Sequence, residues 1–148
     1  MAIYRPQRRR WPALALAAGL GLLLGVALGL AVAGSDDPDV SAAAAEARTR
    51  LTEAAGLLEV AEVEYQESVA DGEVTQEAEY EGALRALERS RSRYLQARPG
   101  LIALAPQVAD DLDARYGDLA LNMEERAPEQ GVSEAAAELI ELLRGDPP

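Results

Sequence analysis

The feature that most constrains this chain is an uncharged, apolar stretch near its start, residues 11–35. A helix rises about 1.5 Å per residue, so about 20 apolar residues cross the hydrocarbon core of a bilayer. Four arginines precede the stretch, Arg5, Arg8, Arg9 and Arg10, and aspartates follow it. Positive residues stay in the cytoplasm. We therefore expect a basic cytoplasmic segment at 1–10, a transmembrane anchor in the cytoplasmic membrane at 11–35, and the remainder outside, periplasmic or extracellular.

A cleaved signal peptide is the alternative, because Ala31-Val32-Ala33 before Gly34 matches a cleavage pattern that follows a basic segment. Two features favour the anchor. The apolar run exceeds the roughly 7–15 residues of a signal peptide's hydrophobic region. Gly21, Gly25 and Gly29 also share one helical stripe at four-residue spacing. This spacing lets membrane helices approach closely, so it predicts a homodimer through the anchor.

The charge of the chain is strongly uneven. All 26 acidic residues lie at or after Asp36, together with only ten of the 14 arginines, which gives that part a formal charge of −16. Such a surface repels nucleic acid and anionic lipid head groups. We expect no nucleic-acid partner, and either a solvated acidic surface or one that attracts cations or a basic protein.

Several residue types that carry chemistry are missing. The sequence contains no Cys, His or Lys, which excludes disulfides and thiolate ligands and closes most routes to an activated nucleophile. We therefore expect no enzyme, no catalytic residues and no firmly bound cofactor. Arginine as the sole basic residue, with abundant Ala, Gly, Leu and Glu, is typical of a GC-rich bacterial genome.

Beyond the anchor, the apolar periodicity is helical throughout and no strand pattern is present. We predict an all-α chain, with one N-terminal transmembrane helix followed by an antiparallel bundle of three to four helices. The expected parts are a linker at 36–40, an exported helical bundle at 41–145 and a loose tail at 146–148. Within the bundle, helices are expected at 41–69, 75–97, 106–126 and 133–144.

The helix boundaries follow from turn residues and from apolar faces. Asp71-Gly72 is expected to end the first helix, and Pro99-Gly100 the second. The first helix should bury a face of residues spaced three and four apart, with Leu57, Val60 and Val63 widening it. Gly56 in its middle weakens it by about 1 kcal/mol relative to Ala. The buried positions of that face are Leu51, Ala54, Leu58, Ala61, Tyr65 and Ser68.

One group of oxygen-bearing side chains flanks the Asp71-Gly72 turn and is the candidate metal site. It consists of Glu62, Glu64, Tyr65, Glu79 and Tyr80. Carboxylate and phenol oxygens suit a hard cation such as ferric iron or calcium. The alternative is structural: tyrosines at helical spacing usually pack in a core, and glutamates usually face water.

The same region carries a resemblance. The run Val-Glu-Tyr-Gln-Glu-Ser-Val-Ala-Asp-Gly-Glu-Val at 63–74, followed by Glu-Ala-Glu-Tyr-Glu at 77–81, resembles the exported helical region of bacterial iron permeases of the Ftr type. The similarity covers about residues 50–145. Such permeases conduct iron through several membrane helices with Arg-Glu-x-x-Glu motifs, whereas the apolar stretch here is single and uncharged. The resemblance implies a domain without the pore, accessory to iron uptake, with an iron permease as partner. The alternative is an envelope interaction module, docking another envelope protein without a metal role.

Overall fold

The computed structural model describes residues 38–145 as four helices and a small hairpin. The elements are α2 (Pro38–Ser68), β1 (Val69–Ala70), β2 (Glu73–Val74), α3 (Glu77–Leu104), α4 (Pro106–Glu124) and α5 (Glu129–Arg144). None of the helices within 38–145 is long and apolar enough to cross a membrane. The expected anchor at 11–35, with Gly21, Gly25 and Gly29, the expected cytoplasmic segment at 1–10 and the expected tail at 146–148 lie outside the described residues.

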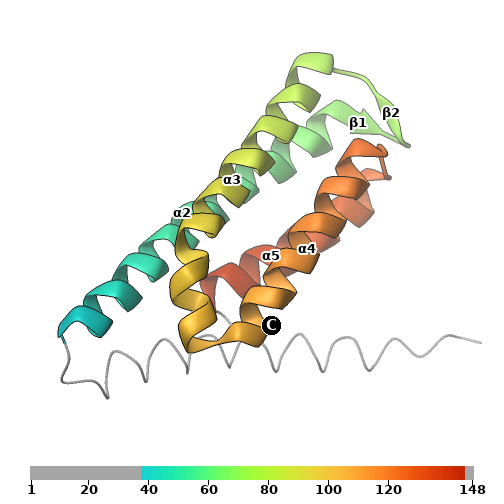
Figure 1. Ribbon diagram of the computed structural model, residues 1–148. Coiled ribbons are helices and arrows are strands. Elements are labelled where there is room, and N and C mark those ends of the chain that lie inside the picture. The colour runs from blue at the N-terminus through green and yellow to red at the C-terminus, as the bar shows by residue number, and fades with distance from the viewer. Residues whose placement is uncertain (1–37, 146–148) are drawn as a thin grey trace, which may run out of the picture.

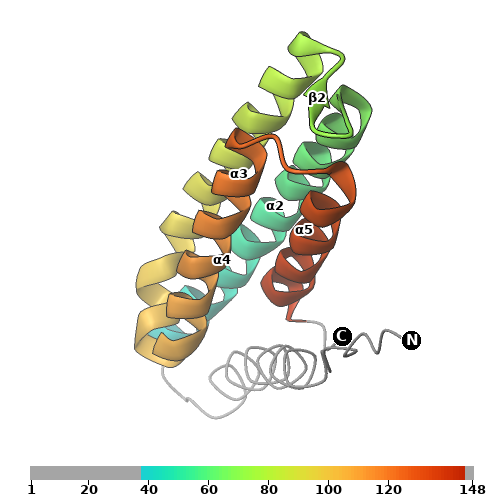
Figure 2. The same cartoon turned by 90° about the vertical axis from the view of Figure 1, so that its right-hand side faces the viewer.

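The four helices run alternately up and down, and each packs against its neighbours in the chain (Figures 1 and 2). The α2–α3 pair makes the most extensive contact, and α5 closes the ring by packing on α2. The hairpin and the α4–α5 turn lie at one end, which we call the hairpin end. The start of α2 and the α3–α4 turn lie at the other, which we call the base. The last residue of α5, Arg144, pairs with Glu59 in the second half of α2, so α2 extends beyond α5 toward the base. The antiparallel helical bundle is thus confirmed.

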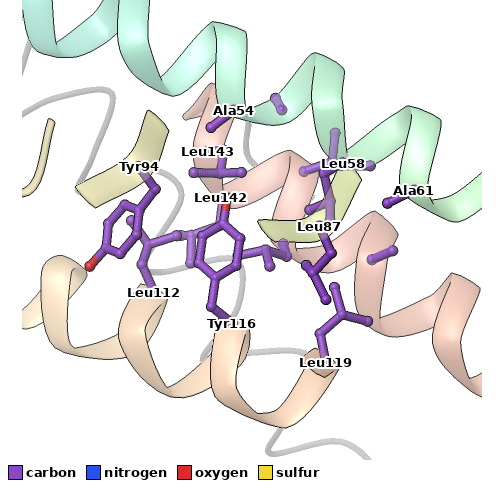
Figure 3. Close-up of a cluster of buried hydrophobic side chains, with 14 of the residues drawn as sticks. Ala54, Leu58, Ala61, Leu87, Tyr94, Leu112, Tyr116, Leu119, Leu142 and Leu143 are labelled. Carbon is purple, nitrogen blue, oxygen red and sulfur yellow. The ribbon is translucent and has the colours of Figure 1, made fainter. Parts of the chain in front are cut away.

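The core is built from one apolar face of every helix. Figure 3 shows Ala54, Leu58 and Ala61 of α2 directed toward side chains of the other three helices. The six positions expected to be buried on α2 are buried, and so are apolar faces of α4 and α5 that include Leu112, Leu119, Leu139 and Leu143. Many of the buried residues of α2 and α3 are alanines. Gly100 of α3 lies beside Ala47 of α2, since a Cβ at Gly100 would be in van der Waals contact with the Ala47 Cβ at 3.5 Å. Small side chains therefore let these two helices pack closely.

The first helix differs from its expected form at its start and on its outer face. It begins at Pro38, so the last three residues of the expected linker are helical. Val60 and Val63, expected to widen the buried face, are 43% and 52% exposed, so that prediction was wrong. Both lie about half a turn from Leu58, because each residue advances a helix by about 100°.

The prediction that the chain contains no strand was also wrong. Val69 pairs with Val74 and Ala70 with Glu73 in an antiparallel hairpin. The two turn residues, Asp71 and Gly72, have φ of 53° and 82°. Two successive positive φ angles are those of a tight two-residue hairpin turn, for which Asp-Gly is a favoured sequence. The Asp71-Gly72 turn therefore follows the end of α2 and also joins the two strands of a hairpin.

The prediction that Pro99-Gly100 ends the second helix was wrong, because α3 continues through Pro99 to Leu104. Proline removes one N–H from the helix, which leaves the carbonyl of residue Leu95 without its usual donor. Leu95 and Pro99 are exposed, so water reaches this position. Leu101, two residues after Pro99, is fully buried. Its burial offsets the lost hydrogen bond and keeps the chain helical.

The last helix is longer than expected, since α5 starts at Glu129 and includes Gly131. Pro128 precedes it in an extended conformation, which suits the residue before a first helical turn. Gly145 ends it with a φ of 71°, as a left-handed C-terminal residue. Arg126, with a φ of 58°, marks the reversal between α4 and α5.

Candidate functional site

Tyr65 and Tyr80, the two tyrosines of the candidate site, do meet at the hairpin end. Their ring centroids are 6.2 Å apart, with the planes tilted by 50°. Tyr65 comes from the last two turns of α2 and Tyr80 from the first turn of α3, so the hairpin between them sets the approach. The Tyr65 hydroxyl donates to the carbonyl of Ala127 at 2.6 Å, and the Tyr80 hydroxyl donates to that of Met123 at 3.0 Å.

These bonds give the two tyrosines a clear structural role. Both carbonyls lie where α4 ends and the chain turns toward α5, so the tyrosines fasten that turn to the first two helices. Burial raises the pKa of Tyr65 to about 12, assisted by Tyr80 and Glu129 and opposed by Arg126. The hydroxyl therefore stays protonated at neutral pH and acts as a donor.

The three glutamates of the candidate site point in different directions. Glu62 accepts a hydrogen bond from Gln66 at 3.1 Å, and Gln66 also donates to Ser133 of α5 at 2.6 Å. Glu62 is therefore on the α5 side of α2. Burial, with a further contribution from Glu59, raises the pKa of the Glu62 carboxyl above its usual range.

Glu64 lies on the opposite, α3 side. A Cβ built on Gly82 would clash with the Glu64 carboxylate, so the missing side chain of Gly82 provides the space that this group occupies. One carboxylate oxygen of Glu64 is buried there without a hydrogen-bond partner. Glu79 is half-buried in the first turn of α3, where a negative charge is favourable to the helix dipole.

The structure thus brings Tyr65 and Tyr80 together but separates Glu62 from Glu64. Within residues 38–145, no three acidic side chains are gathered so that they could hold a metal ion. The Asp110-Asp111-x-Asp113 run is helical, and two of its carboxylates bind arginines: Asp111 binds Arg115 at 2.8 Å and Asp113 binds Arg98 at 2.6 Å. A metal at the five predicted residues stays a prediction.

A second pair of tyrosines, Tyr94 and Tyr116, stacks in the core with centroids 5.2 Å apart and planes 20° from parallel. The Tyr94 hydroxyl lies 2.8 Å from an Asp113 carboxylate oxygen and 2.8 Å from the Ala109 carbonyl oxygen, and these two acceptors share its one proton. Asp113 in turn accepts two bonds from Arg98. These bonds link α3 to α4 through one buried phenol and one half-exposed ion pair.

The Tyr116 hydroxyl completes a link between three helices. Ser90 donates to the Ala54 carbonyl at 2.8 Å, which leaves its oxygen to accept from Tyr116 at 2.7 Å. Burial raises the pKa of Tyr116 to about 12. A buried hydrogen-bonded chain of this kind is favourable only when every member has its partner, as here.

Sequence reasoning missed three of these participants. Ser90 and Asp113 act through partners far along the chain, and no local pattern reveals such pairs. The guanidinium of Arg126 lies 5.7 Å from the Tyr80 ring centroid. Arg126 has a left-handed backbone conformation, which no local sequence pattern predicts. Glu81 and Arg85, four residues apart on α3, form an ion pair at 3.2 Å, a contact that helical spacing alone allows.

The charges are divided along the bundle. Between Arg50 and Arg85 the chain contains ten acidic residues and no basic one, and this segment forms the second half of α2, the hairpin and the start of α3. Most arginines lie nearer the base, where Arg50, Arg93, Arg98 and Arg115 make ion pairs. The hairpin end is therefore the negative end.

A comparison with protein families matches residues 41–145 to a family described as the iron permease-associated 4-helix bundle domain. The match confirms the resemblance found around the two tyrosines and the hairpin turn. The comparisons with curated proteins and with solved structures gave no match. Within residues 38–145, the candidate site consists of hydrogen-bonded tyrosines, ion pairs and acidic side chains.

Proposed function

Because this chain belongs to the iron permease-associated 4-helix bundle family, we propose that its bundle is an accessory domain that acts beside an iron permease. The domain stands outside the cytoplasmic membrane and is held there by the apolar segment at 11–35. It recognises its partner through its surface and catalyses no reaction. Iron is the cargo of the partner in this proposal. The family match over 41–145 is the observation that carries it.

The chemistry of the bundle supports a recognition role. With no His, Cys or Lys, the chain has only Asp, Glu, Tyr, Ser, Thr and Arg for proton transfer or nucleophilic attack. The hydroxyls of the four tyrosines within 41–145 either hold backbone carbonyls or link helices. Tyrosine hydroxyls that are hydrogen-bonded in this way stabilise the bundle.

The geometry also supports the placement relative to the membrane. The start of α2 lies at the base, so a membrane anchor preceding it would hold the base near the bilayer (Figure 1). The 31 residues of α2 span about 46 Å at 1.5 Å per residue. The acidic hairpin end would then stand farthest from the bilayer.

Iron uptake is the measurement that tests the proposal. Cells lacking this chain are expected to take up radiolabelled iron more slowly under iron limitation, and the full chain should restore the rate. The permease must be present for the effect, so a strain lacking both proteins should show no further loss. Equal uptake with and without the chain would refute the accessory role.

The topology has its own test. A reporter that fluoresces only in the cytoplasm, fused after Pro148, is expected to remain dark, while the protein stays with the membrane after alkaline washing. A bright reporter would contradict the outside location. A mature protein that starts at Gly34 would show that the segment is a cleaved signal peptide.

A further inference from the structure

The outer face of α2 carries a continuous uncharged stripe. Its residues are Thr49, Thr52, Gly56, Val60 and Val63, and their spacing of three, four, four and three places them on one side of the helix. We call this set the α2 stripe. Val60 and Val63 are 43% and 52% exposed, and a Cβ built on Gly56 would meet nothing within 4 Å. No element of the described bundle covers this face.

The two threonines add to the apolar character of the stripe. Thr49 donates its hydroxyl to the Ala45 carbonyl at 3.1 Å, and Thr52 donates to that of Arg48 at 3.0 Å. Each hydroxyl therefore bonds to its own helix. The methyl group of each threonine then contributes to an apolar surface that continues into the two valines.

The residue types on the stripe are poor choices for a helix face that only meets water. Thr and Val lose side-chain freedom in a helix, and Gly is the weakest helix former after Pro. Exposed positions elsewhere in the bundle are mostly Glu, Asp, Arg, Gln and Ala, which cost less. A central glycine between β-branched residues instead suits a second helix, because glycine lets another backbone approach closely.

The charges around the stripe indicate which kind of partner helix would bind there. Glu67 continues the stripe toward the hairpin, and Glu59 and Glu53 flank it on either side. Glu53 and Glu59 are bonded to Arg93 and Arg144 of other helices, at 3.4 Å and 2.7 Å, in exposed pairs of the kind that water readily exchanges. The segment between Arg50 and Arg85 contains no basic residue of its own.

We propose that the α2 stripe is the docking surface for a basic amphipathic helix of a partner protein. Its apolar side would lie along Gly56, Val60 and Val63, and its Arg or Lys residues would face the flanking glutamates. A second copy of this chain is disfavoured because it would bring the same glutamates together, and an anionic lipid surface is disfavoured for the same reason. Under the proposed function, on which this identification rests, the helix belongs to the iron permease.

Two glycine variants separate docking from folding. Gly56 and Gly117 are both helical, and a Cβ on either one meets nothing within 4 Å. Gly56→Leu and Gly117→Leu are therefore both expected to raise the Tm, since each replaces a weak helix former on an open face. Only Gly56→Leu places a large side chain in the stripe, and Gly117 lies on α4 as the matched control.

The probe is a fluorescent synthetic peptide of about 20 residues, long enough to be helical, with a Leu/Ala stripe flanked by arginines. The full chain in nanodiscs of zwitterionic lipid is titrated with it, and a scrambled peptide of the same composition controls for charge alone. We expect Gly56→Leu to weaken binding at least about tenfold, and Gly117→Leu to leave it unchanged, although both variants are more thermostable. Binding should also weaken as salt is raised.

A second pair of variants checks the apolar contact without changing any charge. Val60→Gln with Val63→Gln should weaken peptide binding, whereas Leu95→Gln with Leu121→Gln should not, although those leucines are 48% and 52% exposed. Equal binding of the scrambled peptide, or an equal effect of the two pairs, would overturn the docking surface. A dimer that Gly56→Leu dissociates would instead identify the stripe as a contact between two copies and would also overturn it.

The proposed function and the docking surface can fail separately. Gly56→Leu in the full chain should lower iron uptake if the docked helix belongs to the permease. Loss of peptide binding with normal uptake would place the partner elsewhere and overturn that identification. A photoreactive residue at Val63 in cells should cross-link to a permease segment that is basic and amphipathic; a product with a second copy of the chain would refute the assignment.

Discussion

Tyr65 and Tyr80 meet at the hairpin end, whereas Tyr94 and Tyr116 stack nearer the middle of the bundle. Both pairs come from apolar faces with helical spacing, and all four rings are buried. The first pair donates only to backbone carbonyls at the α4–α5 turn. The second pair bonds to side chains, Ser90 and Asp113. A buried tyrosine at helical spacing can therefore either hold a turn in place or connect two helices. Which of the two it does depends on the acceptor that lies opposite its hydroxyl.

The surroundings of the pairs differ in the same way. The hairpin-end pair has Arg126 as its neighbouring cation and lies within the acidic part of the chain. The inner pair is tied to the Arg98–Asp113 ion pair. We therefore expect the inner pair to determine the stability of the whole bundle, and the hairpin-end pair to determine the order of one end.

The largest expected effect comes from removing one ring at a time. Tyr116→Ala leaves a cavity enclosed by all four helices and should destabilise the protein by about 3–5 kcal/mol. Tyr80→Ala should cost at least about 1 kcal/mol less, because Tyr80 lies near the surface and the end can collapse into the space. Urea unfolding monitored by circular dichroism measures both. Equal losses would show that the two regions are equally coupled to the core.

A smaller effect is expected from the backbone at the hairpin. Gly72→Val forces a β-branched residue into a φ of 82°, with its Cβ 3.2 Å from the Arg126 carbonyl oxygen. The cost should be about 1–3 kcal/mol. Gly117→Ala, in open space on α4, should stabilise by about 1 kcal/mol and serves as the control.

Amide hydrogen exchange in the Gly72→Val variant locates the damage. Faster exchange at residues 69–76 and around the α4–α5 turn, with the inner helices still protected, is the pattern that the comparison predicts. Uniform loss of protection along all four helices would contradict it, since it would mean that the hairpin end does not open separately.

The smallest effect is a pair of opposite responses to acid. The pKa of Glu62 is raised in the folded state, so the fold binds its proton more readily than the unfolded chain. As pH falls from the raised value to the usual one, about 4.3, stability should rise. The pKa of Asp113 is lowered, first by its bonds to Arg98, so stability should fall below about pH 3.9.

Two isosteric variants assign these responses. Glu62→Gln should remove the rise on acidification, and Asp113→Asn should remove part of the loss at lower pH. Each change is expected to be no more than about 1 kcal/mol because both groups are partly exposed. Tm measured from pH 7 to pH 3 is the readout. If the Tm of the Glu62→Gln variant still rises on acidification, the rise comes from another carboxylate.

The sequence predicted the bundle well because helix faces are periodic over many residues. Leu51, Leu58 and Tyr65 repeat every seven positions, and all three are buried. The misplaced positions were those where the local signal is ambiguous. Val60 and Val63 are apolar but lie on the far side of the helix, and their hydrophobicity alone suggested burial.

Other details depend on contacts far apart in the chain. The burial of Leu101 keeps α3 helical beyond Pro99, and no local rule reports it. The hairpin did have a local signal, since Asp71-Gly72 lies between Val69-Ala70 and Glu73-Val74, but the short strands were hidden by the strong helix pattern on either side. The bonds of Tyr65 and Tyr80 to the α4–α5 turn span 62 and 43 residues, so the sequence could place the rings but not their partners.

The closure of the ring by α5 has a consequence for how the chain folds. Sequential antiparallel pairs have mostly local contacts, and bundles with such low contact order fold in microseconds to milliseconds. The α2–α3 pair can therefore form early, joined by its two-residue turn. Part of the apolar face of α2 stays uncovered until α5 is made, because α5 packs on α2. The Glu59–Arg144 ion pair, at 2.7 Å, joins these two helices across 85 residues of sequence. During synthesis, the interval before residue 144 emerges is thus the period of greatest exposure to proteases and chaperones.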